Sequence, residues 1–127
     1  MTTFDTQEDT RRKKKAIEIF VNMFGGSYQK LDPNDADYKV FDKDNKLIAY
    51  AEVISRMKNM TASYPLPIQA KKLVKLFDKR ITPVIIWCCD DGIIYVKANK
   101  LRGEIISDSE LIVYYEKQKG FKYIRFV

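Results

Sequence analysis

The apolar positions in the first quarter of the chain recur at helical spacing. This pattern predicts a helix from about Thr6 to Phe24, with a run of basic residues on its solvated side. The glycine pair Gly25-Gly26 ends the helix, since glycine readily adopts the backbone conformation that follows a helix. The side predicted to be buried contains Ile17, Phe20, Val21 and Phe24.

After the glycine pair the pattern changes to that of strands. A short strand is predicted over residues 27–31, and two more over about 37–41 and 46–53. Between the last two lies the polar turn Asp42–Asn45, whose short side chains tolerate a tight reversal. The sequence therefore predicts an antiparallel β-hairpin.

The second half begins with a polar stretch that contains Pro65 and Pro67, beyond which a helix is predicted over about residues 68–80. The nearly continuous apolar run 83–89 is typical of a central strand covered on both faces, with 93–97 as its neighbour. The last thirty residues contain further β-rich pieces. The predicted helix buries Ala70, Leu73, Leu76 and Phe77 and turns Lys71, Lys75 and Lys79 toward water.

Together these elements predict an α/β fold in one domain. A chain of 127 residues with 46% apolar residues can bury a core of its own. We expect residues 1–127 to form that domain, with 1–10 flexible. No apolar run approaches the roughly 20 residues that cross a bilayer, and no signal-peptide pattern follows the early basic residues. The expectation is a cytoplasmic protein without a membrane partner.

The two cysteines, Cys88 and Cys89, are adjacent within the apolar run. Neighbouring side chains of a strand point to opposite faces, so this pair cannot easily form a disulfide. We interpret them as reduced core residues, in preference to a redox or metal role.

Charge and composition narrow the chemistry. A formal net charge of +6 favours a polyanionic partner such as nucleic acid, although such a charge also aids solubility. The chain contains no histidine, which excludes Ser/His and Cys/His hydrolases, histidine-ligated zinc sites and nucleases with a histidine base.

The hairpin carries two acidic residues that could act together. The register set by its turn places Asp37 opposite Ala51 or Glu52, so the two carboxylates are close neighbours. Two hard oxygen ligands suit Mg²⁺, which completes its shell with water and substrate phosphate. The alternative is that both are solvated charges at a strand edge. Glu52 favours the metal site, because an idle carboxylate in an otherwise apolar strand is costly.

Three segments carry a resemblance to a known family: the glycine pair Gly25-Gly26, DADYKVFDKDNKLIAYAEVISR from Asp35 to Arg56, and QAKKLVKLFDKRITPVIIW from Gln69 to Trp87. Their order, with a helix, an Asp-bearing strand, an AEV strand, a Lys-rich helix and a buried strand, resembles the PD-(D/E)xK nuclease superfamily. The resemblance is closest to its small phage and archaeal endonuclease-like or resolvase-like members.

The resemblance implies a restriction-endonuclease-like fold, in which a mixed β-sheet is flanked by helices. It also implies phosphodiester cleavage with Mg²⁺ (or Mn²⁺), with Asp37 and Glu52 as metal ligands. A glutamate of the first helix often joins such a site, and Glu18 is the matching residue here. Glu18 could equally be an ordinary surface residue.

The departure from the family pattern is Ile54, which stands where a catalytic lysine is expected. An isoleucine can neither orient water nor balance charge in the transition state. Lys39, on the same strand face as Asp37, or Lys72, beside the buried stripe of the second helix, could take over this role. Alternatively, metal binding survives with weak catalysis, or the chemistry is lost and the basic surface is kept.

Two functions follow from these observations. The leading hypothesis is an endonuclease acting on DNA, including branched or structured DNA, encoded by a phage in a bacterial host. The alternative is an inactive nuclease-fold protein that binds nucleic acid or a protein partner, and a homodimer is compatible with either. The early basic run is either a solvated helix face or a track for a DNA backbone. The residues expected to contact nucleic acid are Arg11, Arg12, Lys13, Arg56 and Gln69.

Overall fold

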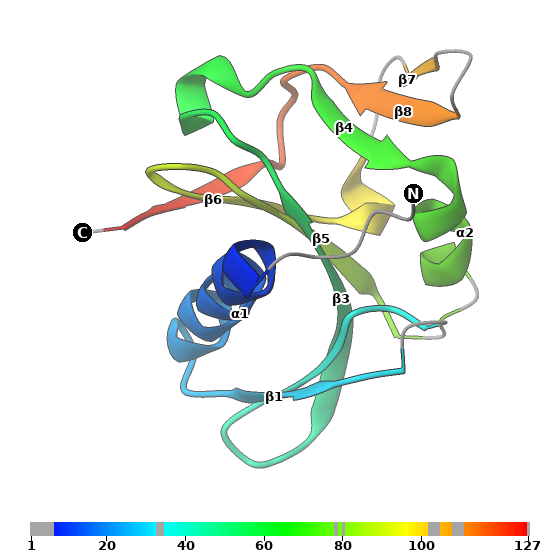
Figure 1. Cartoon of the computed structure of the whole chain (residues 1–127). Coiled ribbons are helices and arrows are strands. Elements are labelled where there is room, and N and C mark those ends of the chain that lie inside the picture. Colours follow the sequence, from blue (N-terminus) through cyan, green and yellow to red (C-terminus); the bar gives the residue numbers. More distant parts are fainter. Residues whose placement is uncertain are drawn as a thin grey trace.

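The computed structural model describes residues 7–32, 35–77, 79, 81–101, 105–107 and 111–126. Its elements form three layers (Figure 1): helix α1, a six-stranded sheet, and a layer of helix α2 with a three-stranded sheet. The helices are α1 (Gln7–Asn22) and α2 (Ala70–Phe77), with two 3₁₀ turns, η1 (Met60–Ala62) and η2 (Ala98–Lys100).

The strands form two separate sheets. The large sheet has the order β1-β2-β3-β5-β6-β9, and the small sheet has the order β4-β8-β7. The strands of the large sheet are β1 (Ser27–Lys30), β2 (Tyr38–Phe41), β3 (Leu47–Ser55), β5 (Pro83–Cys88), β6 (Gly92–Lys97) and β9 (Lys122–Arg125). Those of the small sheet are β4 (Leu66–Gln69), β7 (Ile105–Ser107) and β8 (Ile112–Tyr115).

The large sheet is mixed, because β3 and β5 are parallel while every other neighbouring pair is antiparallel. The chain passes from β3 to β5 through η1, β4 and α2, which is the long connection that parallel neighbours require. The predicted α/β class, with a mixed sheet and helices on both sides, is therefore confirmed.

The predicted hairpin forms with the predicted register. Tyr38 faces Ala51 and Lys39 faces Tyr50, while a bulge between Val40 and Phe41 shifts the pairing near the turn. Extending this register by one residue places Asp37 beside Glu52.

The large sheet has a core on each face. One contains the inner side of α1 and every second residue of β3, such as Ala51 and Val53. The other contains Leu73 and Leu76 of α2 and the buried side of the small sheet. The two cysteines divide between these cores as expected, with Cys88 on the α1 face and Cys89 on the α2 face, and both are free thiols.

The first helix ends where the glycine pair predicts. Gly25 has a φ of +70°, which favours glycine. A Cβ on Gly26 would lie 2.3 Å from the carbonyl oxygen of Phe41 on β2. The helix begins at Gln7, so residues 7–10 of the segment expected to be flexible are helical, and residues 1–6 lie outside the described part.

The second helix is shorter than predicted, because Leu66–Gln69 is strand β4 and the helix begins at Ala70. β4 pairs with β8, some 45 residues later in the chain, and as an edge strand it tolerates Pro67. The prediction that Lys79 faces water is also wrong. Its ammonium pairs with Asp35 and lies 4.6 Å from the ring centre of Tyr50.

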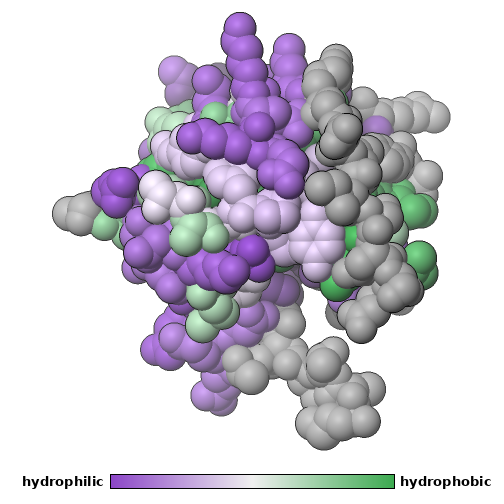
Figure 2. Space-filling model, turned by 90° about the horizontal axis from the view of Figure 1, so that it is seen from above, coloured by the Kyte–Doolittle hydropathy of each residue, from purple (hydrophilic) through white to green (hydrophobic). Residues whose placement is uncertain are grey.

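Hydrophilic side chains cover much of the described surface seen from above in Figure 2, with hydrophobic residues in smaller areas between them. In the described part of the chain, neither helix has the length and apolar character needed to cross a bilayer.

Candidate active site

The ends of β2 and β3 bring Asp37 and Glu52 together. β2 begins at Tyr38, opposite Ala51, so β3 continues past the start of β2 and Asp37 lies beside this extension. The backbone N–H of Asp37 donates to Glu52 Oε1 over 3.3 Å, and the backbone N–H of Val53 donates to Asp37 Oδ2 over 2.8 Å. Both carboxylates are therefore fixed by the backbone of the neighbouring strand.

Glu52 is a buried carboxylate, with only 1% of the residue exposed. It lies on the α2 face of the central strand β3, next to Ile85 of β5. Its neighbours on the same face, Tyr50 and Ile54, pack against the core of that face. A charge in such a place requires compensation.

Lys72 of α2 supplies that compensation. Its Nζ lies 3.3 Å from Glu52 Oε2, and 23% of the lysine side chain is exposed. Lys72 also lines a pocket of about 230 Å³ together with Asp37 and Glu52. The carboxylates of Asp37 and Glu52 and the ammonium group of Lys72 thus line the same pocket. Its other lining residues are Lys13, Lys30, Leu31, Asp32 and Lys75.

The surroundings change the acidity of Glu52. Burial and, next to it, the nearby Asp37 carboxylate raise its pKa to about 7, while Lys72 and Lys75 act in the opposite direction. Near neutral pH the pair therefore shares less than two full negative charges. A cation in the pocket would favour the ionised form of Glu52, because it would offset both burial and repulsion.

The donor set fits a magnesium site that keeps several water ligands. Mg²⁺ is commonly bound through one or two carboxylates, with water and phosphate filling the other positions. Asp37 and Glu52 are such a pair. Within the described residues no group of three or more Asp, Glu, Cys or His side chains is placed to share a metal ion. The geometry therefore does not suit a structural zinc site with four protein ligands.

Of the two lysines predicted as substitutes at Ile54, the structure places Lys72 in the pocket. Lys39 faces Tyr50 and Gln29 on the neighbouring strands and is not among the residues that line the Asp37–Glu52 pocket. The positive charge of Lys39 acts on Asp35. The pKa of Asp35 is lowered chiefly by the hydrogen bond from Lys79, and the charge of Lys39 lowers it further. Ile54 itself packs against the core on the α2 face.

Glu18 lies apart from the two carboxylates. Its Oε2 accepts a hydrogen bond of 3.0 Å from the hydroxyl of Tyr28, and it lines a different pocket with Asn22 and Ser27. The structure therefore does not bring the acidic residue of the first helix to Asp37 and Glu52.

The residues predicted to contact nucleic acid are mostly engaged within the protein. Arg12 donates to Ser55 Oγ, the Cys88 carbonyl and Asp90, all within 3.3 Å. The guanidinium of Arg56 donates to the carbonyl oxygens of Ser63, at 2.9 and 3.1 Å, and Pro65, at 3.4 Å.

The other three members of that set differ in their exposure. Arg11 is exposed and pairs with Glu8 on the same helix. Lys13 is paired with Asp9 at 3.7 Å and lines the Asp37–Glu52 pocket. Gln69 is exposed at the end of β4.

The Asp37–Glu52 pocket is also lined by residues that the sequence analysis did not assign to a site. Lys75 lies one helical turn after Lys72 and joins it in the lining, a pairing that i, i+3 spacing could have indicated. Lys30 is the last residue of β1 and Asp32 follows it, and both reach the pocket through the pairing of β1 with β2. No local pattern identifies those two residues.

Searches against protein-family models, curated proteins and solved structures found no match to this chain.

Proposed function

We propose that this protein is a Mg²⁺-dependent endonuclease of the PD-(D/E)xK type that hydrolyses phosphodiester bonds in DNA. The observation that carries the proposal is the convergence of Asp37, Glu52 and Lys72 in one pocket. The order of elements supports it: a helix, three antiparallel strands, a connection through β4 and a second helix, and a strand parallel to the third.

Each residue has a definite role in this proposal. Asp37 and Glu52 would hold the metal, which when bound would polarise the phosphodiester and activate the attacking water. Lys72 would replace the lysine missing at Ile54, because its ammonium lines the pocket and can stabilise the negative charge that develops on the phosphate. Lys75 adds positive charge to the same wall, which favours the approach of a polyanion.

A specific observation favours a second candidate, an inactive nuclease-fold protein that binds nucleic acid. Three carboxylate oxygens of the acidic pair already have protein partners: Asp37 Oδ2, Glu52 Oε1 and Glu52 Oε2. Lys72 can neutralise Glu52 without a metal. In this second candidate the acidic pair only ties β2, β3 and α2 together.

Cleavage of plasmid and branched DNA with Mg²⁺ or Mn²⁺ separates the two candidates. We expect Asp37→Asn, Glu52→Gln and Lys72→Gln each to lower the rate about 100-fold or more, because the two carboxylates would hold the metal and Lys72 would stabilise the charge that develops on the phosphate. Lys39→Gln is the matched control for Lys72→Gln, since it removes the same charge outside the pocket.

The outcomes are distinct. Cleavage that depends on Asp37, Glu52 and Lys72 but not on Lys39 supports the endonuclease. A folded wild-type protein that binds DNA and cuts none of these substrates with either metal supports the inactive binding protein. Cleavage that is indifferent to Asp37 and Glu52 rejects the site.

A further inference from the structure

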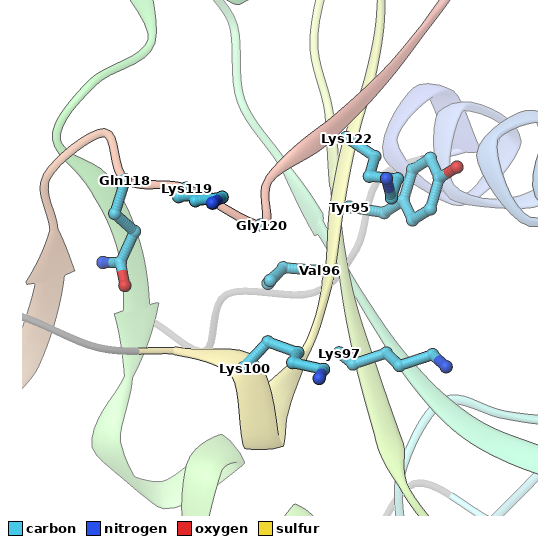
Figure 3. A pocket seen from close by; sticks show the side chains of 8 residues that line it. All are labelled: Tyr95, Val96, Lys97, Lys100, Gln118, Lys119, Gly120 and Lys122. Carbon is cyan, nitrogen blue, oxygen red and sulfur yellow. The ribbon is translucent and has the colours of Figure 1, made fainter.

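A second pocket, of about 690 Å³, lies at the end of β6 and has a strongly basic rim. In the large sheet β6 is separated from β3 by β5, so this pocket is distinct from the one that contains Asp37 and Glu52. Figure 3 shows Lys100, Lys119 and Val96 beside the gap between β6, η2 and the turn that precedes β9, while Tyr95, Lys97 and Lys122 extend from the other side of β6. Four of them are lysines: Lys97, Lys100, Lys119 and Lys122.

The end of the β6–β9 pairing creates this pocket. β9 pairs with β6 only from Gly92 to Tyr95, whose partner is Lys122, so Val96 and Lys97 continue beyond β9. The turn before β9 then approaches η2. Gly120, with a φ of +107°, permits this turn, and a Cβ at that position would lie 3.8 Å from the Cβ of Lys100.

The four lysines come from four segments: β6, η2, the turn before β9, and β9 itself. All four are exposed. Among the residues that the structure describes, none of the four forms an ion pair with a carboxylate, and no acidic residue lines this pocket. In contrast, Lys13, Lys72 and Lys79 are all paired.

Such a cluster favours an anionic ligand. Ammonium groups around one pocket repel each other, and the field they create attracts anions from solution. The pocket volume of about 690 Å³ is many times the roughly 30 Å³ that one water molecule occupies in the liquid. The pocket therefore has room for more than a single phosphate group. The half-buried Tyr95 adds apolar surface on the side of Lys97 and Lys122, on which a sugar or base edge can pack, while Val96 is buried beneath the pocket.

We propose that this pocket is a nucleic-acid-binding site in which the four lysines contact successive phosphates of one strand. It goes beyond the proposed cleavage, since strand binding without a metal does not require Asp37 or Glu52. It also relocates the nucleic-acid contact, because Arg12 and Arg56, predicted for that role, are bonded to the protein's own backbone and side chains.

The test uses the full chain in EDTA and a fluorescein-labelled single-stranded oligodeoxynucleotide, with binding measured by anisotropy at several salt concentrations. The pocket variant is Lys100→Gln/Lys119→Gln. The control variant is Lys43→Gln/Lys46→Gln, which removes two equally exposed charges at the turn between β2 and β3. Circular dichroism establishes that both variants are folded.

We expect the pocket variant to bind about tenfold more weakly or worse. Its plot of log affinity against log salt should be shallower by about 1.4, the value for two phosphate contacts on a single strand. The control variant should stay within about twofold of wild type, because long-range charge effects are screened at physiological salt. Equal losses in both variants, or no loss in the pocket variant, would overturn the proposal.

A competition arm separates a strand from a small phosphorylated ligand. Deoxyadenosine monophosphate carries the same phosphate chemistry but spans only one position. We expect it not to displace the oligonucleotide at equal phosphate concentration. Displacement as effective as that by unlabelled oligonucleotide would assign the pocket to a mononucleotide and reject the strand-binding site.

Discussion

At the scale of single residues, the environment of Glu52 departs strongly from that of a free glutamate in water. It is a carboxylate on the buried face of a central strand, held by one backbone N–H and one ammonium group. Burial and the neighbouring Asp37 raise its pKa to about 7. The folded protein therefore retains the Glu52 proton at a pH at which the unfolded chain has lost it.

This difference makes stability depend on pH. The proton on Glu52 favours the folded state fully below about pH 4.5, the ordinary value for the group, and this contribution is lost as pH rises through about 7. Glu52→Gln stays neutral throughout. Relative to wild type, its free energy of unfolding should therefore rise between pH 5 and pH 8 by up to about 3 kcal/mol.

Urea denaturation at both pH values measures this change. Glu116→Gln, at an exposed position, is the control and should follow wild type. If Glu52→Gln and wild type lose stability in parallel between pH 5 and pH 8, Glu52 does not titrate as its surroundings indicate.

At the scale of elements, the N-terminal half of α1 is attached to the sheet through Arg12. Its guanidinium reaches Ser55 at the end of β3 and the Cys88 carbonyl at the end of β5, and 20% of its side chain is exposed. The side chain of the adjacent Arg11 is 76% exposed, and among the described residues its ion-pair partner is Glu8 of its own helix turn. Two neighbouring arginines thus have different structural roles.

Arg12→Ala should lower the free energy of unfolding by about 1–3 kcal/mol, because it removes the hydrogen bonds to Ser55, Cys88 and Asp90 that attach α1 to the ends of β3 and β5. Arg11→Ala should change it by no more than about 0.5 kcal/mol, as is usual for a surface ion pair. Urea denaturation of the two variants provides the comparison. Equal effects would show that the bonds of Arg12 do not stabilise the attachment of α1.

At the scale of the whole molecule, Trp87 joins the two sheets. It is fully buried on β5 of the large sheet, and its indole N–H donates to the carbonyl oxygen of Pro67 on β4 of the small sheet over 2.7 Å. Its ring also packs edge-to-face on Phe121, which precedes β9. The small sheet therefore shares its core with the large one.

This shared core predicts a single unfolding transition. Trp87 is the only tryptophan, so its fluorescence reports the junction between the sheets, while far-UV circular dichroism reports the whole backbone. We expect the two signals to give the same urea midpoint. Separate midpoints would mean that the small sheet unfolds independently.

Local patterns were sufficient for most of the fold. Helical spacing located α1, the glycine pair located its end, and the Asp42–Asn45 turn set the β2–β3 register, because each depends on neighbours within a few residues. Strand β4 was missed because its partner, β8, is remote in sequence. The same reason applies to the lysine pocket, which gathers four separate segments.

The sequence alone was enough to pair Asp37 with Glu52, since strand parity and a short turn leave little freedom in where two residues of a hairpin lie. It left open which lysine stands beside them. The answer depends on how helix α2 packs against β3. This packing brings Lys72 to Glu52, while Lys39 lies near Asp35. Such packing depends on contacts between distant segments, and no local spacing of residues specifies it.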